Sequence, residues 1–568
     1  MKKLLKPMKN KIPQVGFIFI FLLIQVYCDL TLPQYTADIV NIGIQNTNFQ
    51  FIIDTGLVML LMVAISAIAT VGVSYFSSRV SSGYAKDLRK IIYSKVLKFS
   101  NHELNNISRS SLITRTTNDI NQLQGILGFI FTTLIFAPLL GVGSIIKVFE
   151  LQTDLSWIII VNFVAVLVLL VIVMVRVVPY FKITQEIIDR INKTAREILI
   201  GIPVIKAFVR QDYEENKFQK VNQKFYDVNL YVFKTIMIIL PLMTLIMNLM
   251  VVLILYFGAY DAIRNGVLTG DIIAFIQYAT QIITSFLMIG VFIIMLPRFL
   301  VSARRISEVL NTEITITDGE LTDISAHPTI EFRNVSYRYP GSEKETLKDI
   351  SFTLKPGKTT AIIGGTGSGK STILNLIPRL QDPNSGEILM DGINIKNINL
   401  KSLRDRISFT PQKAILFQGD VKSNMRIGKS DANDDEIQKA LRLAQVDFVN
   451  DLAEEVTQGG SNFSGGQKQR LSIARAIIGH HEFYLFDDCF SALDMNTERK
   501  IKNNLKGLKD SSILIVSQRI STIMDAEEIL VIDNGQIIDR GTHDGLLESC
   551  EIYREIANIQ IDYMEALS

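Results

Sequence analysis

The sequence predicts an α-helical membrane domain followed by an α/β domain, and three observations indicate this fold class. Hydrophobic residues make up 48% and charged residues 20% of the 568 residues, and the mean hydropathy of +0.28 is high for a water-soluble protein. The long apolar runs all lie before about residue 300. After residue 328, short β-rich runs alternate with helix-like segments, which is typical of an α/β domain with parallel strands.

Charge and cysteine content exclude several other classes. The 58 basic and 56 acidic residues leave a net charge of +2, so no charge excess attracts nucleic acid and we expect no nucleic-acid partner. The three cysteines, Cys28, Cys489 and Cys550, are too few for a disulfide framework. Five histidines without any C-x-x-C pair argue against a zinc cluster.

Six apolar runs each approach or exceed the roughly 20 residues that a helix needs to cross a bilayer. A buried core helix would explain one such run, but not six. The first run follows a lysine-rich start, as in a signal peptide, but residues 29–33 make a poor cleavage site, so we expect a retained helix. Asp29 lies close to the outer end of this predicted helix, where we expect a solvated carboxylate. Contact of Asp29 with other helices is the alternative. The runs are 13–35, 55–78, 125–148, 156–178, 235–260 and 271–296.

The basic residues between the runs predict the orientation. Eight lie in the connection 79–124 and eleven in the connection 176–234, whereas the other connections carry almost none. Both termini and these two helical connections are therefore expected in the cytoplasm. We divide the chain into a membrane domain at 1–310, a polar linker at 311–328 and an α/β domain at 329–568.

A glycine-rich loop follows the apolar strand predicted at 359–363 and precedes a helix-like segment, as the G-x-x-x-x-G-K-[ST] motif requires. Glycines let backbone N–H groups curl around phosphate oxygens at the positive end of a helix. Lys370 would reach the β- and γ-phosphates and Ser371 would ligate Mg²⁺. The second domain is therefore expected to be an α/β P-loop nucleotide-binding domain that uses ATP and Mg²⁺. Its predicted ATP-binding residues include Gly364, Gly365, Thr366, Gly367, Ser368, Gly369, Lys370, Ser371 and Thr372.

Two further motifs lie downstream of this loop. Asp487 ends the apolar strand predicted at 483–487 and is suited to hold the metal through water. About twenty residues earlier comes an S-G-G-Q segment, which by itself could be an ordinary turn at a helix start. Its position between a phosphate loop and a carboxylate strand makes it far more specific. It consists of Ser464, Gly465, Gly466 and Gln467.

Together these motifs resemble those of the ATP-binding cassette (ABC) transporters, in particular the bacterial exporter half-transporters that fuse six membrane helices to one cassette. The resemblance covers nearly the whole chain. It implies that the S-G-G-Q signature closes over ATP held by the phosphate loop of a second cassette. It also implies that Tyr339 stacks on adenine, with core packing as the alternative, and that Gln412 contacts Mg²⁺ and senses the membrane domain. The loop implied to communicate between the two sites is Ser491, Ala492, Leu493 and Asp494.

The membrane half carries the resemblance too, in residues 196–208. Exporters of this family have a short coupling helix just beyond that point, around Arg210–Phe218 here, although an ordinary amphipathic helix is equally compatible with the sequence. The bend Phe99–Glu103 is the other expected coupling element, and Asn265–Asp271 resembles the turn that leads into the sixth helix.

Two positions depart from the family pattern. The glutamate that usually follows the metal carboxylate and activates the attacking water is Asp488 here, which withdraws the carboxylate by about 1.5 Å. The histidine of the usual His-Arg pair is Gln518, and an amide cannot share a proton as imidazole can. With Lys370, these are the predicted catalytic residues. Both changes in one cassette indicate a degenerate site that binds ATP and hydrolyses it poorly.

We therefore expect half of a heterodimeric exporter in the bacterial inner membrane. It would move small hydrophobic or amphipathic solutes, in contact with membrane lipid, together with a second half-transporter whose site does most of the hydrolysis. A homodimer is the less expected assembly. A membrane regulator that binds ATP without transporting anything is the alternative from another class, and lipid, peptide or haem-like cargo remains open.

Overall fold

The computed structural model describes residues 2–151, 155–325, 328–508 and 510–565. It divides into two compact units. One unit comprises Met1–Val96 and Ser110–Asn311, and the other comprises Leu97–Arg109 and Thr312–Ser568. The predicted linker at 311–328 includes residues 326 and 327, which lie outside the described residues.

The first unit is helical. Among the described residues, six helices are long and apolar enough to cross a membrane, which confirms the six predicted runs. Each helix continues well beyond its apolar run, as expected for the long helical connections. The spans are Lys3–Ile44, Phe49–Val96, Arg109–Glu150, Ser156–Ala207, Gln211–Arg264 and Thr269–Asn311.

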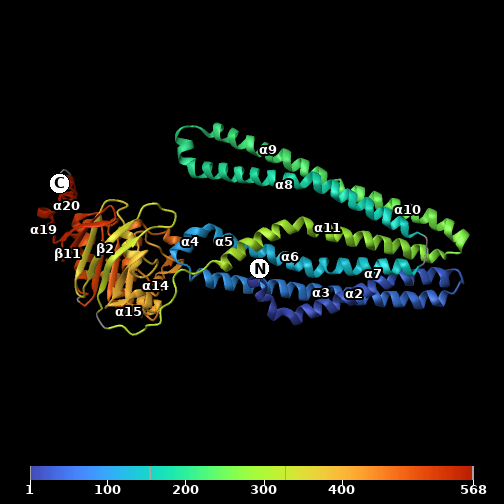
Figure 1. Ribbon diagram of the computed structural model, residues 1–568, viewed down its shortest axis with the longest axis horizontal. Helices are drawn as coiled ribbons and strands as arrows, with labels where there is room; N and C mark the ends of the chain where they lie inside the picture. The colour runs from blue at the N-terminus through green and yellow to red at the C-terminus, as the bar shows by residue number, and fades with distance from the viewer. Residues whose placement is uncertain (1, 152–154, 326–327, 509, 566–568) are drawn as a thin grey trace. The chain divides into compact units, whose positions relative to one another are not determined.

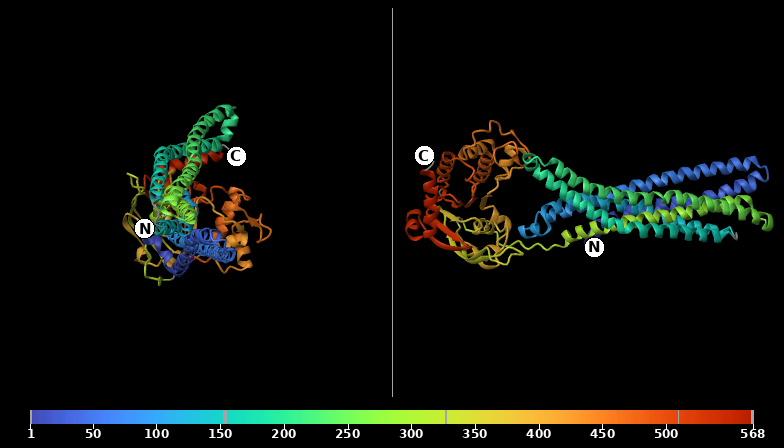
Figure 2. Two further views of the ribbon diagram at one scale, coloured as in Figure 1. Left: turned by 90° about the vertical axis from the view of Figure 1, so that its right-hand side faces the viewer. Right: turned by 90° about the horizontal axis from the view of Figure 1, so that it is seen from above.

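Within these spans, α2 and α3 run side by side, as do α8 and α9 (Figures 1 and 2). Helices α7 and α11 also contact each other and α2. The elements of this unit are α1 (Lys2–Leu5), η1 (Lys6–Lys11), α2 (Ile12–Asp38), η2 (Ile39–Ile44), α3 (Phe49–Val96), α5 (Arg109–Thr114), η3 (Arg115–Asp119), α6 (Ile120–Phe129), η4 (Ile130–Leu134), α7 (Phe136–Glu150), α8 (Ser156–Ala207), α9 (Gln211–Met237), α10 (Ile239–Asn265) and α11 (Thr269–Asn311).

The predicted position of Asp29 at the outer end of its helix is wrong. Helix α2 does not end near residue 35, because Pro33 is accommodated inside it, and η2 extends the helix to Ile44. Asp29 therefore lies about 22 Å before the end of its spanning helix, at a rise of 1.5 Å per residue.

The segment Arg210–Phe218, where a coupling helix is predicted, forms the start of a longer helix. Arg210 is instead the cap of α9, which runs without a break from Gln211 to Met237. No Pro or Gly follows residue 218 closely enough to end the helix there. Asp212 and Glu214 lie in the first turn of α9, where their negative charges interact favourably with the helix dipole. By contrast, the turn at Asn265–Asp271 is found as expected, with Gly266 in the left-handed region at φ +72°.

The first connection does contain a separate short helix, α4 (Asn101–Ile107), which clusters with the second unit. Ser100 caps it, and Glu103 completes the capping box. Glu103 Oε1 also accepts hydrogen bonds from Thr315 N at 3.0 Å and from Thr315 Oγ1 at 2.7 Å. Burial would raise the pKa of Glu103, but the hydrogen bonds from Ser100 and Thr315 together lower it.

The second unit contains two main sheets. In the six-stranded sheet, five strands are parallel, and β12 pairs antiparallel at the edge. In order they are β12 (Gln536–Gly541), β11 (Glu528–Asp533), β3 (Thr359–Gly364), β10 (Ser512–Val516), β9 (Phe483–Asp487) and β6 (Ile407–Thr410). The antiparallel sheet is β2 (Leu347–Leu354), β1 (Ile330–Tyr337), β4 (Ser385–Met390) and β5 (Ile393–Asn394).

The central strands are apolar throughout because both faces of their sheet are buried. Phe483 and Leu485 of β9 pack into one core with the antiparallel sheet, whereas Tyr484 and Phe486 pack into a second core with helices such as α16. The remaining elements are η5 (Ile395–Asn397), β7 (Gly419–Asp420), β8 (Glu455–Val456), η6 (Gln458–Gly460), α12 (Lys370–Leu376), α13 (Leu400–Arg404), α14 (Val421–Met425), α15 (Asp434–Leu443), α16 (Gly465–Ile477), α17 (Met495–Leu505), α18 (Ile520–Ile523), α19 (His543–Ser549) and α20 (Glu551–Glu565).

Candidate functional site

The carboxyl ends of the parallel strands bring the predicted site together. Val516 of β10 pairs with Ile362 of β3 on one side and with Asp487 of β9 on the other, so these three strands end at the same edge. The phosphate loop follows β3, Asp488 follows β9 and Gln518 lies just after β10, all at this edge. Gln412 lies beside them, just after β6. Ligands bind at such an edge in open α/β sheets.

A cavity of about 300 Å³ opens at this edge. Residues far apart in the sequence line it, and they include the predicted adenine platform, the phosphate loop and both altered positions. The lining residues are Tyr339, Thr346, Thr366, Gly367, Gly369, Lys370, Ser371, Thr372, Gln412, Asp487, Asp488, Val516 and Gln518.

The loop needs glycine at particular positions. Gly367 and Gly369 have φ of +84° and +101°, a region that side chains with a Cβ rarely adopt. A Cβ on Gly369 would also meet the Thr346 carbonyl oxygen at 2.9 Å. The loop is therefore held tightly beside the strands and opens its backbone toward the cavity at the start of α12.

Lys370 lies across the loop. Its Nζ donates to the carbonyl oxygens of Gly364 at 2.8 Å and Gly365 at 2.7 Å. Burial lowers the pKa of Lys370, while Asp488 and Asp487 act to raise it. The ammonium is thus satisfied by neutral carbonyls, which an anionic phosphate would replace favourably.

Ser371 and Asp487 form the predicted metal pair, with Ser371 Oγ donating to Asp487 Oδ1 at 3.0 Å. Burial raises the pKa of Asp487, the bond from Ser371 lowers it, and Asp488 raises it further. A cation at this point would relieve the repulsion between the two carboxylates. This hydroxyl and carboxylate, with the amide of Gln412 nearby, fit Mg²⁺, which takes oxygen ligands from few protein groups and keeps several waters.

Asp488 occupies a constrained position. Its φ is +45°, and its backbone N donates to Val516 O at 2.9 Å. Gln412 Nε2 donates to Oδ2 at 3.4 Å, whereas the buried Oδ1 has no hydrogen-bond partner among the described residues. Burial raises the pKa of Asp488, and the bond from Gln412, the backbone of Gln518 and nearby Lys370 and Arg519 act to lower it.

Gln518 is held by the C-terminal helix, a contact that sequence reasoning missed. Gln560 of α20 donates from Nε2 to Gln518 O at 2.7 Å, and its Oε1 accepts from Ile520 N at 2.8 Å. One side chain therefore fixes the loop after β10. No motif in the sequence marks Gln560.

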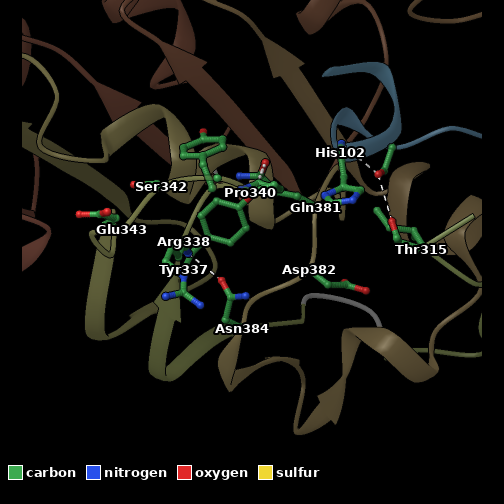
Figure 3. A pocket seen from close by; sticks show the side chains of 14 residues that line it. His102, Thr315, Tyr337, Arg338, Pro340, Ser342, Glu343, Gln381, Asp382 and Asn384 are labelled. Carbon is green, nitrogen blue, oxygen red and sulfur yellow. Dashed lines mark hydrogen bonds between the residues drawn. The ribbon is translucent and has the colours of Figure 1, made fainter. Parts of the chain in front are cut away.

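Tyr339 borders the cavity. Its hydroxyl lies 3.1 Å from Thr372 Oγ1, and its ring packs edge-on against Tyr337 with centroids 5.0 Å apart. Tyr339 also borders a second cavity of about 630 Å³, which His102 of α4 and Gln381 line as well (Figure 3). The charged residues of the predicted site, Lys370, Asp487 and Asp488, line the smaller cavity.

The signature and the loop at residues 491–494 do not line this chain's own cavity. Ser464 caps α16, with Gln467 completing the capping box. A Cβ built on Gly465 meets nothing within 4 Å, so this glycine is open to the surroundings. Ser491 O accepts from Arg519 Nη2 at 2.7 Å, and Asp494 caps α17.

Two more residues near the site escaped the sequence analysis. Thr346 lines the cavity from the loop before β2, and no pattern marks it. Gln469 of α16 donates from Nε2 to Gln412 O at 2.7 Å and so links the helix after the signature to the predicted metal-contacting residue. Its position five residues after Ser464, on the inward face of a capped helix, is the signal that could have found it.

Comparisons with known proteins place this arrangement in a family. Residues 15–286 match the ABC transporter transmembrane region, and residues 347–491 match the ABC transporter family. An uncharacterized ABC transporter ATP-binding protein of Mycobacterium tuberculosis is 36% identical over 559 residues, covering 96% of each chain. An ATP-dependent lipid A-core flippase of Pseudomonas fluorescens is 32% identical over 518 residues, covering 89% of this chain and 85% of the relative.

Two further comparisons agree. A probable multidrug resistance ABC transporter ATP-binding/permease protein of Bacillus subtilis is 32% identical over 496 residues, covering 85% of this chain and 84% of that protein. The solved structure of a bacterial Atm1-family ABC exporter with ATP bound superimposes with a TM-score of 0.79 at 23% identity, covering 97% of this chain and 98% of the other. That structure supports the fold, namely six membrane helices followed by a nucleotide-binding domain.

Proposed function

The chain belongs to the ABC transporters, and from this premise we propose that it is the weakly hydrolysing half of a heterodimeric exporter. As a fused half-transporter of that family, it carries an ATPase domain coupled to transport, uses ATP with Mg²⁺, and acts as a dimer in lipid. The proposal adds that the partner is a different half-transporter, whose own site performs most of the hydrolysis.

One observation carries the proposal: a complete binding surface and two altered hydrolytic positions share one cavity. Tyr339 and the phosphate loop line it, and so do Asp488 and Gln518. A site that had lost its function altogether would have no reason to keep the strained glycines, Lys370 and the Ser371–Asp487 pair. The combination favours retained ATP binding with slow turnover.

The binding residues act through charge and shape. Tyr339 offers a ring face for adenine, and the loop amides together with Lys370 hold the phosphates. Mg²⁺, when bound by Ser371 and Asp487, would neutralise charge on the β- and γ-phosphates. Gln412 donates to Asp488 through Nε2 and is anchored through its carbonyl oxygen by Gln469.

Asp488 and Gln518 are poorly suited to catalyse ATP hydrolysis. A carboxylate that deprotonates water must reach it, and a displacement of about 1 Å can cost about 100-fold in rate. Asp488 cannot extend its carboxylate, because its backbone is tied to Val516 and its Oδ2 faces Gln412. Gln518 can donate a hydrogen bond to a γ-phosphate, but it cannot exchange a proton there.

The signature supports the paired arrangement. Its open glycine, Gly465, leaves room for another molecule's phosphate to approach the backbone. In the heterodimer this signature would complete the partner's competent site, while the partner's signature would cover the weak site. The basic connections support a bacterial cell-membrane location with both termini and the cassette in the cytoplasm. The cargo we propose is a hydrophobic or amphipathic solute of the multidrug type, as the name of the Bacillus relative suggests for that protein.

Restoring the two altered residues tests the proposal without knowledge of the partner. The purified chain alone should bind ATP but hydrolyse it slowly. The double variant Asp488→Glu with Gln518→His should hydrolyse at least about tenfold faster, because the longer carboxylate reaches the water and the imidazole can share a proton. The measurement is steady-state ATPase in lipid nanodiscs. A wild-type chain that hydrolyses ATP as fast as an active double variant would contradict the proposed weak site.

Transport is tested separately. Inside-out vesicles that contain the chain and a co-expressed half-transporter should accumulate an apolar dye when ATP is added. The single variant Gly465→Glu should not, because it blocks the signature that completes the partner's competent site and leaves only the weak site. If no solute accumulates although ATP is hydrolysed, the chain is not an exporter, and a regulatory role gains support.

A further inference from the structure

We propose that Asp29 and Ser66 form the recognition site for the positive charge of an organic cation within the membrane unit. This inference rests on the proposed export of hydrophobic or amphipathic solutes and names the chemical class of one of them. The site lies where four membrane helices, α2, α3, α7 and α11, meet.

The carboxylate is partly buried where α2 and α3 pack together. Ser66 Oγ of α3 donates to Asp29 Oδ1 at 2.9 Å. By the helical rise, Asp29 and Ser66 are about 22 and 25 Å from the outer ends of their spanning helices at Ile44 and Phe49. Asp29 lies within the apolar run 13–35, where an ionised carboxylate is expensive unless a positive charge or a proton compensates it.

No protein cation compensates this carboxylate among the described residues. Within the described part of the chain, Asp29 takes part in no ion pair, and Ser66 is the only side chain that hydrogen-bonds to its carboxylate. Lys147, on the neighbouring α7, is itself paired with Glu150 at 2.7 Å. Intramembrane carboxylates without such a partner commonly mark a pathway for a cation or a cationic substrate.

The surrounding helices hold the site firmly. On α11, Gln281 Nε2 donates to Asp29 O at 3.0 Å, and Tyr278 donates through its hydroxyl to Leu30 O at 2.8 Å. Ser144 of α7 donates in turn to Gln281 Oε1 at 2.8 Å. The bonds from Gln281 and Tyr278 therefore hold the backbone of α2, whereas the Asp29 carboxylate is bonded by Ser66.

The close approach of α7 adds to this rigidity. A Cβ on Gly143 would collide with the Leu30 side chain, which follows Asp29 directly in the sequence. The backbone that carries Asp29 is therefore wedged between α7 and α11, and a site held in this way can orient a ligand without large rearrangement.

Aromatic side chains lie on the same pair of helices, toward the cytoplasm. The Phe76 ring stacks on Phe17 with centroids 5.3 Å apart and on Phe21 with centroids 6.0 Å apart. Phe21 is about 12 Å from Asp29 along α2. A carboxylate with aromatic rings at this spacing matches an amphipathic cation, whose charge meets Asp29 and whose apolar body contacts the rings.

Equilibrium dialysis of radiolabelled tetraphenylphosphonium, a permanent aromatic cation, tests the inference on the purified full chain in nanodiscs. Wild-type protein should bind it saturably, and Asp29→Asn should weaken binding by at least about tenfold, since loss of one ion pair easily exceeds 1.4 kcal/mol in a low dielectric. Asp29→Glu should keep most of the affinity. Asp54→Asn, which changes an exposed carboxylate near the outer end of α3, is the matched control and should bind as wild type does.

A competition experiment keeps the test sharp if a variant fails to fold. In wild-type protein, unlabelled tetraphenylphosphonium should displace the label at a concentration at least about tenfold lower than neutral triphenylphosphine oxide. Equal competition, no saturable binding, or full binding by Asp29→Asn would each overturn the inference. Vesicles that export a neutral dye but show no preference for the cation would overturn it as well, while leaving the proposed export intact. Vesicles that export nothing would instead overturn the proposed function.

Discussion

The two sides of the nucleotide cavity are built differently. The phosphate side is lined by the backbone of a loop in which glycines adopt positive φ, and by one lysine at the start of α12. The hydrolytic side is lined by two side chains, those of Asp488 and Gln518, just after β9 and β10. The phosphate side follows the usual pattern, and the hydrolytic side departs from it twice.

This contrast shows why binding and turnover can separate. Backbone geometry is set by the sheet and tolerates little change, since a Cβ on Gly364 would already collide with the Ile532 carbonyl. On the hydrolytic side, how far the carboxylate at position 488 extends depends on a single side-chain methylene. A glutamate can become an aspartate there without disturbing the fold. A chain can therefore keep ATP binding and lose most of its catalytic rate by changing two residues.

The largest expected effect comes from the signature. In the assembled pair, Gly465→Glu should lower ATPase by about 100-fold or more, because a charged side chain would occupy the space where the backbone approaches the γ-phosphate of the partner's ATP. Steady-state ATPase of the co-purified heterodimer is the measurement. Nothing lies within 4 Å of a Cβ at this position, so the chain by itself should fold and bind nucleotide normally.

Gly465→Ala, which adds only a methyl group, serves as the control. We expect it to lower the ATPase activity less than Gly465→Glu does. If Gly465→Glu left the pair fully active, the signature would not complete a competent site, and the asymmetry would have to be abandoned.

A smaller effect is expected from the hydrolytic side of the same chain. Asp488→Asn in the heterodimer should reduce total ATPase only a few-fold, whereas loss of a true general base typically costs about 10² to 10⁴. The variant keeps the size of the side chain, so nucleotide affinity, followed with a fluorescent ATP analogue, should change little. A loss as large as that of Gly465→Glu would show that this chain's own cavity is catalytic.

The smallest effect concerns Glu103, which contacts neither side of the cavity and should change stability alone. Glu103→Gln should lower the Tm of the full chain at pH 7 by about 3–6 °C, because the carboxylate accepts charge-assisted bonds from Ser100 and Thr315. Its folded pKa lies below the ordinary value of about 4.3, so this stabilisation is present above that pH and is lost as the pH falls through the folded pKa.

Thermal shifts at pH 7 and pH 4 measure this difference, which should be smaller at pH 4. The exposed Glu343→Gln should show no such pattern. A Tm difference that grows on acidification would contradict the assigned ionised state of Glu103.

The sequence by itself determined the six spans, the alternation of strands and helices, and most of the residues around the cavity, although not Thr346. These features depend on local patterns: apolar length, strand burial and motif spacing. The phosphate loop and Gln412 follow strands, Asp487 ends one, and the carboxyl ends of parallel strands meet at the same edge of a sheet. Their convergence therefore followed from the order of elements alone, as did the exposure of Asp488 and Gln518 to the same cavity.

Only the tertiary structure decided how side chains from distant segments meet. Gln560 and Gln469 brace the cavity from helices with no motif, through contacts 42 and 57 residues away in the sequence. Helix α2 continues past Pro33, so Asp29 does not lie near the end of its helix; a proline in an apolar run does not by itself reveal whether neighbouring helices support it. Such pairings depend on three-dimensional packing between elements, and that information is not present in the local period or composition of any one segment.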